Sequence, residues 1–154
     1  MSQIIIRQAS TDDLDQILQI EALSFTVPWT KDSFLSAFSS EYMTLFAAEK
    51  NGAVVGFGCL ALLPPECEIP NIAVHPEKRG QGIGELIFKS MLDHAAEKGA
   101  DTAFLEVRES NTPARTLYEK NGFVSIGIRR DYYTKPTENA VIMQKTPLTV
   151  NNTI

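Results

Sequence analysis

A glycine-rich segment between an apolar run and an amphipathic run constrains this chain more than any other feature. Ile72, Ala73 and Val74 form a short apolar run, which Pro76 ends because proline cannot donate to a β-ladder. Glycines follow at alternate positions, and one helical face then continues through Leu86, Ile87, Ser90, Met91, His94 and Ala95. The segment therefore predicts a strand, a loop with little side-chain cover and a long helix.

Bare backbone in front of a helix favours anion binding. The helix N-terminus carries unpaired N–H groups and the positive end of the macrodipole, and glycines let a phosphate approach them. No Gly-Lys-Ser/Thr follows the glycines, and the dinucleotide pattern would need glycine at Glu85 or Ile87. The loop matches Gln/Arg-x-x-Gly-x-Gly/Ala instead, through Arg79, Gly82 and Gly84. The alternative interpretation is a glycine turn that opens an ordinary helix.

The other patterns place this segment in the middle of one α/β domain over residues 1–146, followed by a flexible tail over 147–154. We expect four helices, with N-caps at Ser10, Thr30 and Asn111 for three of them and Phe34, Leu35 and Phe38 on one side of the second. Asn51-Gly52 predicts a tight hairpin. We expect strands at 3–9, 43–49, 54–62, 66–74, 102–107, 123–132 and 140–144. They form a mixed sheet with hairpins at both ends and parallel crossovers in the middle.

Composition excludes several classes of protein. A chain of 154 residues can bury a hydrophobic core, and its net charge of −5 argues against nucleic acid as the main partner. His75 and His94 are too isolated for a zinc site, so we expect no metal. Cys59 and Cys67 lie in expected strands and are interpreted as buried reduced thiols, with a disulfide or a nucleophile as alternatives. With no signal peptide and no apolar run of membrane length, we expect a cytoplasmic protein and no membrane partner.

Four further sequence segments agree with the glycine loop, and one more precedes it. LEVRxSN begins at Leu105, ARxLYEKNGF at Ala114, RRDYY at Arg129 and AVIM at Ala140, while FxxPWT begins at Phe25. In this order they resemble the bacterial ribosomal-protein alanine N-acetyltransferases, a branch of the GNAT acetyltransferase superfamily. The resemblance extends from about residue 5 to residue 145. One departure is a proline at position 70, where the branch usually carries an apolar residue able to pair.

The resemblance implies the GNAT fold and acetyl transfer from acetyl-CoA to an amine, without a metal. The expected substrate is the N-terminus of a small-subunit ribosomal protein that begins with alanine. In the family the fourth and fifth strands splay apart around the pantetheine, which Ile72, Ala73 and Val74 would contact. Asn111 would hydrogen-bond the cofactor arm, or act only as an N-cap. The pyrophosphate would be held by Arg79, Gly80, Gln81, Gly82, Ile83, Gly84 and Glu85.

The reaction needs a base, because an amine with a pKa of about 8 to 10 is mostly protonated at neutral pH. Glu106 is the expected base, since it lies in an apolar strand and matches the position that the branch uses. The alternative is an outward-facing glutamate paired with Arg108. Tyr118 is the expected acid for the departing thiolate, one helical turn after Ala114 and at the position of the family's tyrosine. The alternative is a tyrosine packed in the core.

Other polar and aromatic residues are candidates for binding the acceptor. Glu66 and Glu68 are two apart on one strand and therefore share a face, where they would bind a cationic amine or help to relay its proton. The alternative is that both are solvated charges of a hairpin. Trp29 would line a substrate groove or plug the core. Tyr132 and Tyr133 would line the peptide groove, near Arg129 or Arg130, or simply end an aromatic strand.

Two other functions remain open at this point. The first is a GNAT enzyme that acts on a different amine, such as a polyamine, an amino acid or a lysine side chain. The second is a CoA-binding module without catalysis.

Overall fold

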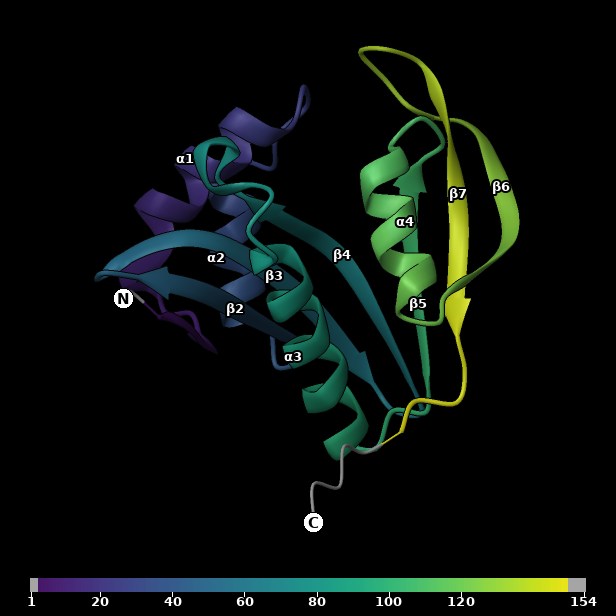
Figure 1. Ribbon diagram of the computed structural model, residues 1–154, viewed down its shortest axis with the longest axis horizontal. Coiled ribbons are helices and arrows are strands. Elements are labelled where there is room, and N and C mark those ends of the chain that lie inside the picture. The colour runs from purple at the N-terminus through teal and green to yellow at the C-terminus, as the bar shows by residue number, and fades with distance from the viewer. Residues whose placement is uncertain (1–2, 150–154) are drawn as a thin grey trace.

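A seven-stranded mixed sheet carries helices on both faces in the computed structural model, which describes residues 3–149 (Figure 1). The strands are β1 (Ile4–Gln8), β2 (Met43–Lys50), β3 (Ala53–Leu63), β4 (Glu66–Val74), β5 (Thr102–Arg108), β6 (Val124–Tyr133) and β7 (Glu138–Lys145). The helices are α1 (Leu14–Ser24), α2 (Lys31–Ser39), α3 (Ile83–Glu97) and α4 (Thr112–Lys120). The predicted mixed α/β architecture is confirmed.

The sheet opens between its two central strands. Its strand order is β1-β2-β3-β4-β5-β7-β6, and every neighbouring pair is antiparallel except β4 and β5. These two pair only where residues 66–68 lie beside residues 102–104. Beyond that point they diverge, and Figure 1 shows the opening between β4 and β5. The expected parallel crossovers are confirmed: α3 joins β4 to the parallel strand β5, and α4 joins β5 to β6, which runs in the same direction with β7 between them.

Local sequence signals explain where the helices begin. Ser10 and Asp13 form a capping box around a 3₁₀ turn that leads into α1. Thr30 accepts the N–H of Ser33 at the start of α2, and Asn111 caps α4 in the same way. The Asn51-Gly52 turn, with positive φ at both residues, joins β2 to β3 as predicted.

The core forms two clusters, one on each face of the sheet. The larger one holds α3 and part of α4, and the smaller one holds α1 and α2. Gly58 lets α3 approach β3 closely, since a Cβ there would lie 2.7 Å from the Met91 side chain. The predicted helix faces were partly wrong: Leu35 and Leu86 are exposed, whereas Phe88 is completely buried. The helices are rotated relative to the predicted stripe, because the sheet surface decides which side is covered.

Three further sequence expectations concern the cysteines, the membrane and the tail. Cys59 and Cys67 are free and buried, as predicted. Among residues 3–149, no helix is long and apolar enough to cross a membrane. Leu148 packs on the larger core cluster and donates its N–H to the carbonyl of Asp101 at 2.8 Å. The rest of the expected tail, residues 150–154, lies outside the described residues.

Candidate active site

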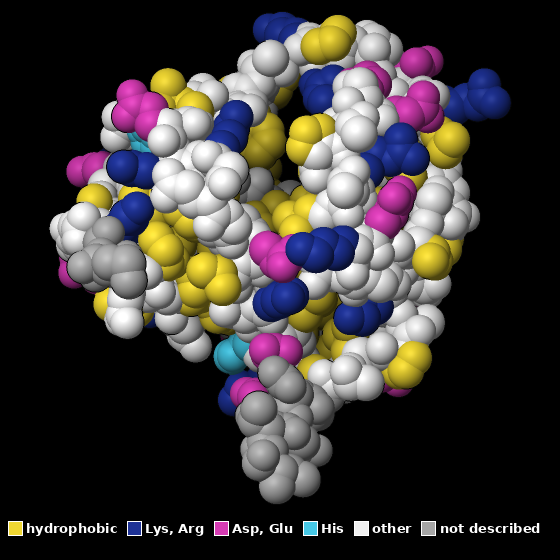
Figure 2. Space-filling view, in the orientation of Figure 1, with side chains coloured by type: hydrophobic (Ala, Val, Ile, Leu, Met, Phe, Trp, Pro, Cys, Tyr) yellow, Lys and Arg dark blue, Asp and Glu magenta, His cyan; other side chains and the backbone are white. Residues whose placement is uncertain are grey.

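A cleft of about 430 Å³ lies where β4 separates from β5, and we call it the interstrand cleft. Figure 2 shows the molecule hollowed between its two halves. β4 contributes one wall, β5 the other, and the α1–α2 connection and the end of β6 border the opening. The lining residues are Trp29, Glu68, Ile69, Pro70, Phe104, Leu105, Glu106, Arg129, Tyr132, Tyr133 and Ile142.

Successive side chains of β5 point to opposite faces of the sheet, so they divide between the two sides of this opening. Ala103, Leu105 and Val107 are buried in the larger core cluster, on the side of α3 and α4. Because successive strand residues point to opposite faces, Glu106 points to the side of α1 and α2. Glu68 lies on that side too, since its neighbours Cys67 and Ile69 belong to the larger cluster. The cleft therefore gathers its carboxylates on one face and has the glycine loop and α4 on the other.

Only one of the two oxygens of the Glu106 carboxylate has a hydrogen-bond partner among the described residues. Its Oε1 accepts a hydrogen bond from Arg129 Nε at 3.0 Å, and within residues 3–149 the carboxylate forms no ion pair with Arg108 or with any further cation. Arg108 instead pairs with Glu138 at 3.2 Å, so the alternative interpretation of Glu106 named the wrong partner. The second oxygen, Oε2, is buried and has no hydrogen-bond partner among residues 3–149. A buried acceptor without a donor is costly, so this oxygen is suited to a ligand that brings a proton.

Two consecutive tyrosines, Tyr132 and Tyr133, line the same cleft beside a bulge near the end of β6. Arg129 pairs with Ala140, but the next pair joins Tyr133 to Glu138, so β6 holds extra residues there. Asp131 adopts a φ of 51° and donates its N–H to the side chain of Asn139 at 3.0 Å. Consecutive residues of β5, Phe104 to Glu106, also line the cleft, because it lies where two strands separate and is reached from both faces of the sheet.

The tyrosine hydroxyls at the cleft are weak acids. The charge of Glu106 is the main cause that raises the pKa of Tyr132, and burial is the main cause that raises the pKa of Tyr133 to about 12. Both side chains therefore stay protonated at neutral pH. They remain available as hydrogen-bond donors at the mouth of the cleft.

Backbone donors on β4 also face the opening. His75 donates its N–H to Val55 on β3 at 2.8 Å, so the antiparallel alternation turns the N–H groups of Ile72 and Val74 away from β3. They point to the side that β5 has left. Pro70 lies within a register shift of β4, where Ile69 and Pro70 have no paired residue on β3. Its missing N–H therefore removes no ladder bond, which explains how a proline is tolerated here.

The glycine loop forms an open cradle at the head of α3. Gly80 and Gly82 have φ values of 82° and 79°, a region that other residues rarely adopt. A Cβ at either position would meet no described heavy atom within 4 Å, so space rather than packing surrounds them. Gly82 is the N-cap of α3 and offers no side-chain cap for the first N–H groups. Open space beside uncapped N–H groups fits an anion such as a pyrophosphate.

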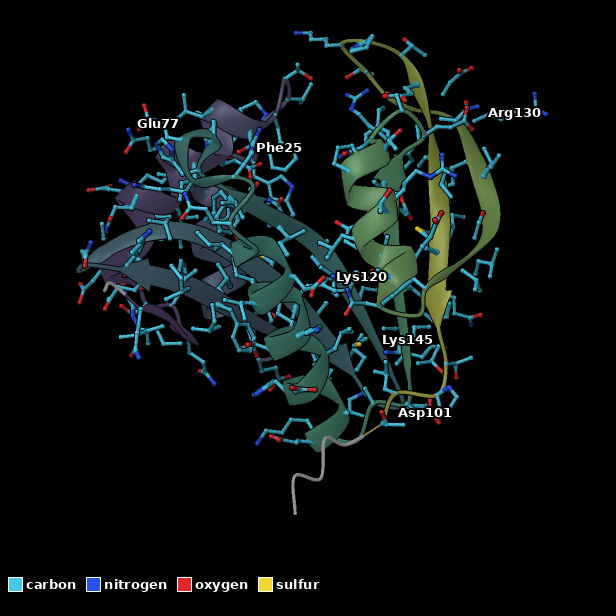
Figure 3. All side chains as sticks on the ribbon, viewed as in Figure 1. Phe25, Glu77, Asp101, Lys120, Arg130 and Lys145 are labelled. Carbon is cyan, nitrogen blue, oxygen red and sulfur yellow. The ribbon has the colours of Figure 1, made fainter. Side chains whose placement is uncertain are left out.

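Side chains around this cradle make specific contacts. Arg79 donates through Nε to the carbonyl of Val74 and through Nη2 to Ser24 Oγ, both at 3.1 Å, so part of its guanidinium braces the loop. Glu85 pairs with Lys120 at 3.1 Å, and this contact lowers the pKa of the carboxyl. Figure 3 labels Lys120 near the end of α4, where this pair joins α3 to α4 beside the opening.

Tyr118 lies behind the cleft rather than in its lining. It is 7% exposed, and its ring packs on Phe88 at a centroid distance of 4.9 Å and near Phe123. Burial, and then the neighbouring Tyr133, raise the pKa of its hydroxyl. The interpretation as a core tyrosine is therefore correct for the ring.

The structure brings most of the predicted acceptor residues together. Trp29, Glu68, Tyr132 and Tyr133 all line the cleft, although Trp29 also packs on Phe34 at 5.3 Å and so serves the core as well. Glu66 does not line it, because it lies at the closed end where β4 still pairs with β5.

Of the two arginines named in advance, Arg129 lines the cleft, whereas Figure 3 shows Arg130 on the outer side of β6. Apolar side chains that were not predicted from the sequence also line the cleft: Ile69, Phe104 and Ile142. No motif marks these residues, and only the separation of the strands exposes them.

Comparisons with known proteins agree with this geometry. The chain matches the model of the acetyltransferase (GNAT) family over residues 14–123. It is 42% identical over 139 residues to a Bacillus subtilis (strain 168) protein provisionally named ribosomal protein bS18-alanine N-acetyltransferase, covering 90% of this chain and 92% of that one. It is 38% identical over 142 residues to the Haemophilus influenzae ribosomal protein bS18-alanine N-acetyltransferase, with coverages of 90% and 96%. The crystal structure of the ribosomal-protein-S18-alanine N-acetyltransferase from Escherichia coli has a TM-score of 0.89 at 32% identity, over 99% of both chains.

Proposed function

The chain belongs to the GNAT acetyltransferase family and is therefore an acetyl-transferring enzyme, and we propose that it acetylates the N-terminal alanine of ribosomal protein bS18 with acetyl-CoA. The observation that carries this proposal is the interstrand cleft, which has the glycine cradle on one side and the unpartnered Glu106 oxygen on the other. A coenzyme and an amine can then approach the same opening from opposite faces of the sheet. The similarity to enzymes named for bS18 supports the choice of acceptor.

We assign the donor side to the cradle and to β4. The loop from Arg79 to Glu85 holds the pyrophosphate of acetyl-CoA at the head of α3. The N–H groups of Ile72 and Val74, which face the opening, pair with the pantetheine arm, and Ala73 lies between them. Asn111 contacts the same arm while it caps α4. This arrangement brings the thioester to the place where the two strands separate.

The acceptor side is assigned to the carboxylates and aromatic residues. Trp29, Tyr132 and Tyr133 hold the substrate's first residues, and Glu68 attracts the positive α-amine, with Glu66 further along the same strand. Glu106 Oε2 accepts a proton from the amine as it attacks the thioester carbon. Its Oε1 stays on Arg129, which keeps the second oxygen aimed into the cleft. A net charge of −5 suits a basic ribosomal protein as partner.

We assign to Tyr118 the role of the acid that donates a proton to the leaving thiolate. Its raised pKa makes the phenol a weak acid, but burial also raises the pKa of a thiol, since it disfavours the charged form of both groups. A thiolate formed beside a buried phenol is therefore a stronger base than a free thiolate in water. The same hydroxyl can also stabilise the leaving sulfur by a hydrogen bond before the proton moves.

A peptide panel tests the proposed function. Peptides that differ only in their first residue are mixed with enzyme and acetyl-CoA, and CoA release is followed. We expect an alanine start to give the highest kcat/KM, and mass spectrometry to place the acetyl group on the α-amine. The matched control carries a blocked α-amine and a free internal lysine. Turnover on that control, or on a polyamine, at the rate of the alanine peptide would refute the assignment.

A further inference from the structure

One buried carboxylate has no role in the chemistry described above. Glu21, near the end of α1, is 1% exposed. Its Oε2 accepts the backbone N–H of Trp29 at 2.8 Å, and its Oε1 accepts Nδ2 of Asn71 at 2.8 Å. The side chain thus ties three segments together: α1, the connection before α2, and the middle of β4.

The burial of this carboxylate is costly. Removing an ion from water costs several kcal/mol unless donors replace the lost hydration. Burial raises the pKa of Glu21 in spite of the hydrogen bonds from Trp29 and Asn71. The same face of α1 is otherwise filled by Leu14, Ile17 and Ile20. An apolar residue would therefore pack there at lower cost, but it would leave both donors unsatisfied.

Of the two groups that Glu21 holds, one lines the interstrand cleft and the other is next in the chain to a residue that lines it. Trp29 lines it directly, and Asn71 follows Pro70, which lines the opposite wall. The connection between α1 and α2 is also held at its other end, because Ser24 accepts a hydrogen bond from Arg79. Residues 25–29 are therefore fixed at both ends, once by the cradle and once by Glu21.

We propose that Glu21 is a positioning residue that fixes Trp29 relative to β4 and thereby shapes the acceptor side of the cleft. The kinetic part of this inference rests on the proposed function, whereas the structural part does not. Replacing a residue that only stabilised the fold would change KM for the peptide and KM for acetyl-CoA alike. A residue that positions Trp29 affects the acceptor and leaves the acetyl-CoA side unchanged.

The decisive variants exchange a donor and an acceptor. Glu21→Gln keeps the shape of the side chain but replaces one carboxylate oxygen with an amide nitrogen. That nitrogen, itself a donor, then faces one of the two donors, the N–H of Trp29 or Nδ2 of Asn71. Adding Asn71→Asp restores the pattern, since the new amide nitrogen can donate to the new carboxylate. Gln16→Ala is the matched control: Gln16 is another polar residue of α1 that accepts a backbone N–H, from Val54 at 2.8 Å, but it does not border the cleft.

The first measurement is the fluorescence of Trp29, which is the only tryptophan of the chain and needs no substrate. We expect Glu21→Gln to shift the emission to the red and to increase quenching by acrylamide, the double variant to reverse both changes, and Gln16→Ala to leave them as in the wild type. Unchanged emission and quenching in Glu21→Gln would overturn the inference. If Glu21→Gln does not fold, Asn71→Ala removes one of the two contacts and must show the same changes.

The second measurement compares the two KM values. We expect Glu21→Gln to raise KM for the alanine-starting peptide by about tenfold, as for a buried donor left unpaired, while KM for acetyl-CoA stays within about twofold. The double variant should restore the peptide KM. Equal increases in both KM values would overturn the positioning role. If the wild type fails to acetylate any peptide, the proposed function fails, and the fluorescence of Trp29 still decides the role of Glu21.

Discussion

Replacing Glu106 with glutamine isolates proton acceptance from shape. The amide oxygen can keep the hydrogen bond from Arg129 Nε that Oε1 accepts at 3.0 Å. The amide nitrogen then takes the place of Oε2, which is buried and has no partner among the described residues. The opposite orientation would set the amide nitrogen against the arginine, so it is disfavoured. Glu106→Gln therefore converts the acceptor that faces the cleft into a donor, with little change in packing.

The size of the effect depends on which step the carboxylate assists. An N-terminal amine has a pKa of about 7.7 to 8.0, so about one molecule in ten is neutral at pH 7. If Glu106 only removed the proton of the resting ammonium, its loss would cost at most about tenfold at pH 7 and nothing above about pH 9. A base that takes the proton in the transition state contributes about 10²- to 10⁴-fold, or roughly 3 to 5 kcal/mol.

The assay is kcat/KM for the alanine peptide from pH 6.5 to about 9.5, with thermal unfolding as a check on the fold. We expect Glu106→Gln to lose about 10²- to 10⁴-fold at pH 7, and the loss to shrink by about tenfold, without vanishing, at high pH. Glu68→Gln is the matched control in the same cleft. It is exposed, and we expect it to raise the peptide KM by no more than about fivefold. A loss below about threefold at pH 7 for a folded Glu106→Gln, or an equal loss for Glu68→Gln, would refute the role as base.

Three other predictions follow from single contacts. Gly82→Ala, at a φ of 79°, should cost about 1 to 2 kcal/mol of stability and raise KM for acetyl-CoA. Gly99→Ala, at a φ of 99° beyond the opposite end of α3, should show the strain alone, and equal KM values in the two variants would contradict the cradle. Tyr118→Phe keeps the packed ring, so thermal stability should change little while kcat falls by about ten- to 100-fold; an unchanged kcat would remove the tyrosine as acid. Burial raises the pKa of Glu21 above its ordinary 4.5, so the folded state binds this proton more tightly than the unfolded state. Its contribution to stability is therefore full below pH 4.5 and is lost as the pH rises through the folded pKa. Thermal unfolding of Glu21→Gln from pH 4 to about 7 should then lose less stability than the wild type, and parallel curves would contradict the shift.

Features that depend on neighbouring residues were predicted well. The caps at Ser10, Thr30 and Asn111, the hairpin at Asn51-Gly52 and the glycine loop all appear where the sequence placed them. Each is governed by contacts or φ values within a few residues, so the relevant energies can be read from a short segment. The orientation of helices was predicted less well, as Leu86 and Phe88 show, because the partner surface is formed by distant strands.

The bulge in β6 shows the same limit at the candidate site. The sequence marks Tyr132 and Tyr133 as an aromatic pair, but the alternation of a regular strand would divide them between two faces. Asp131 adopts its positive φ only where β6 loses register with β7. The bulge therefore depends on how β6 pairs with β7, which the residues around the two tyrosines do not specify.

By itself, the sequence determined the local chemistry of this protein: a phosphate loop before a helix, a glutamate in an apolar strand, and a tyrosine on the following helix. The separation of β4 from β5 was expected from the family resemblance. Only the tertiary structure decided that it begins after three paired residues, that Glu106 engages Arg129, and that Glu21 holds Asn71 fifty positions away. The physical reason is range. Caps and turns are set by energies within a few residues, whereas a cleft exists only where distant segments fail to pair, and no local pattern encodes that separation.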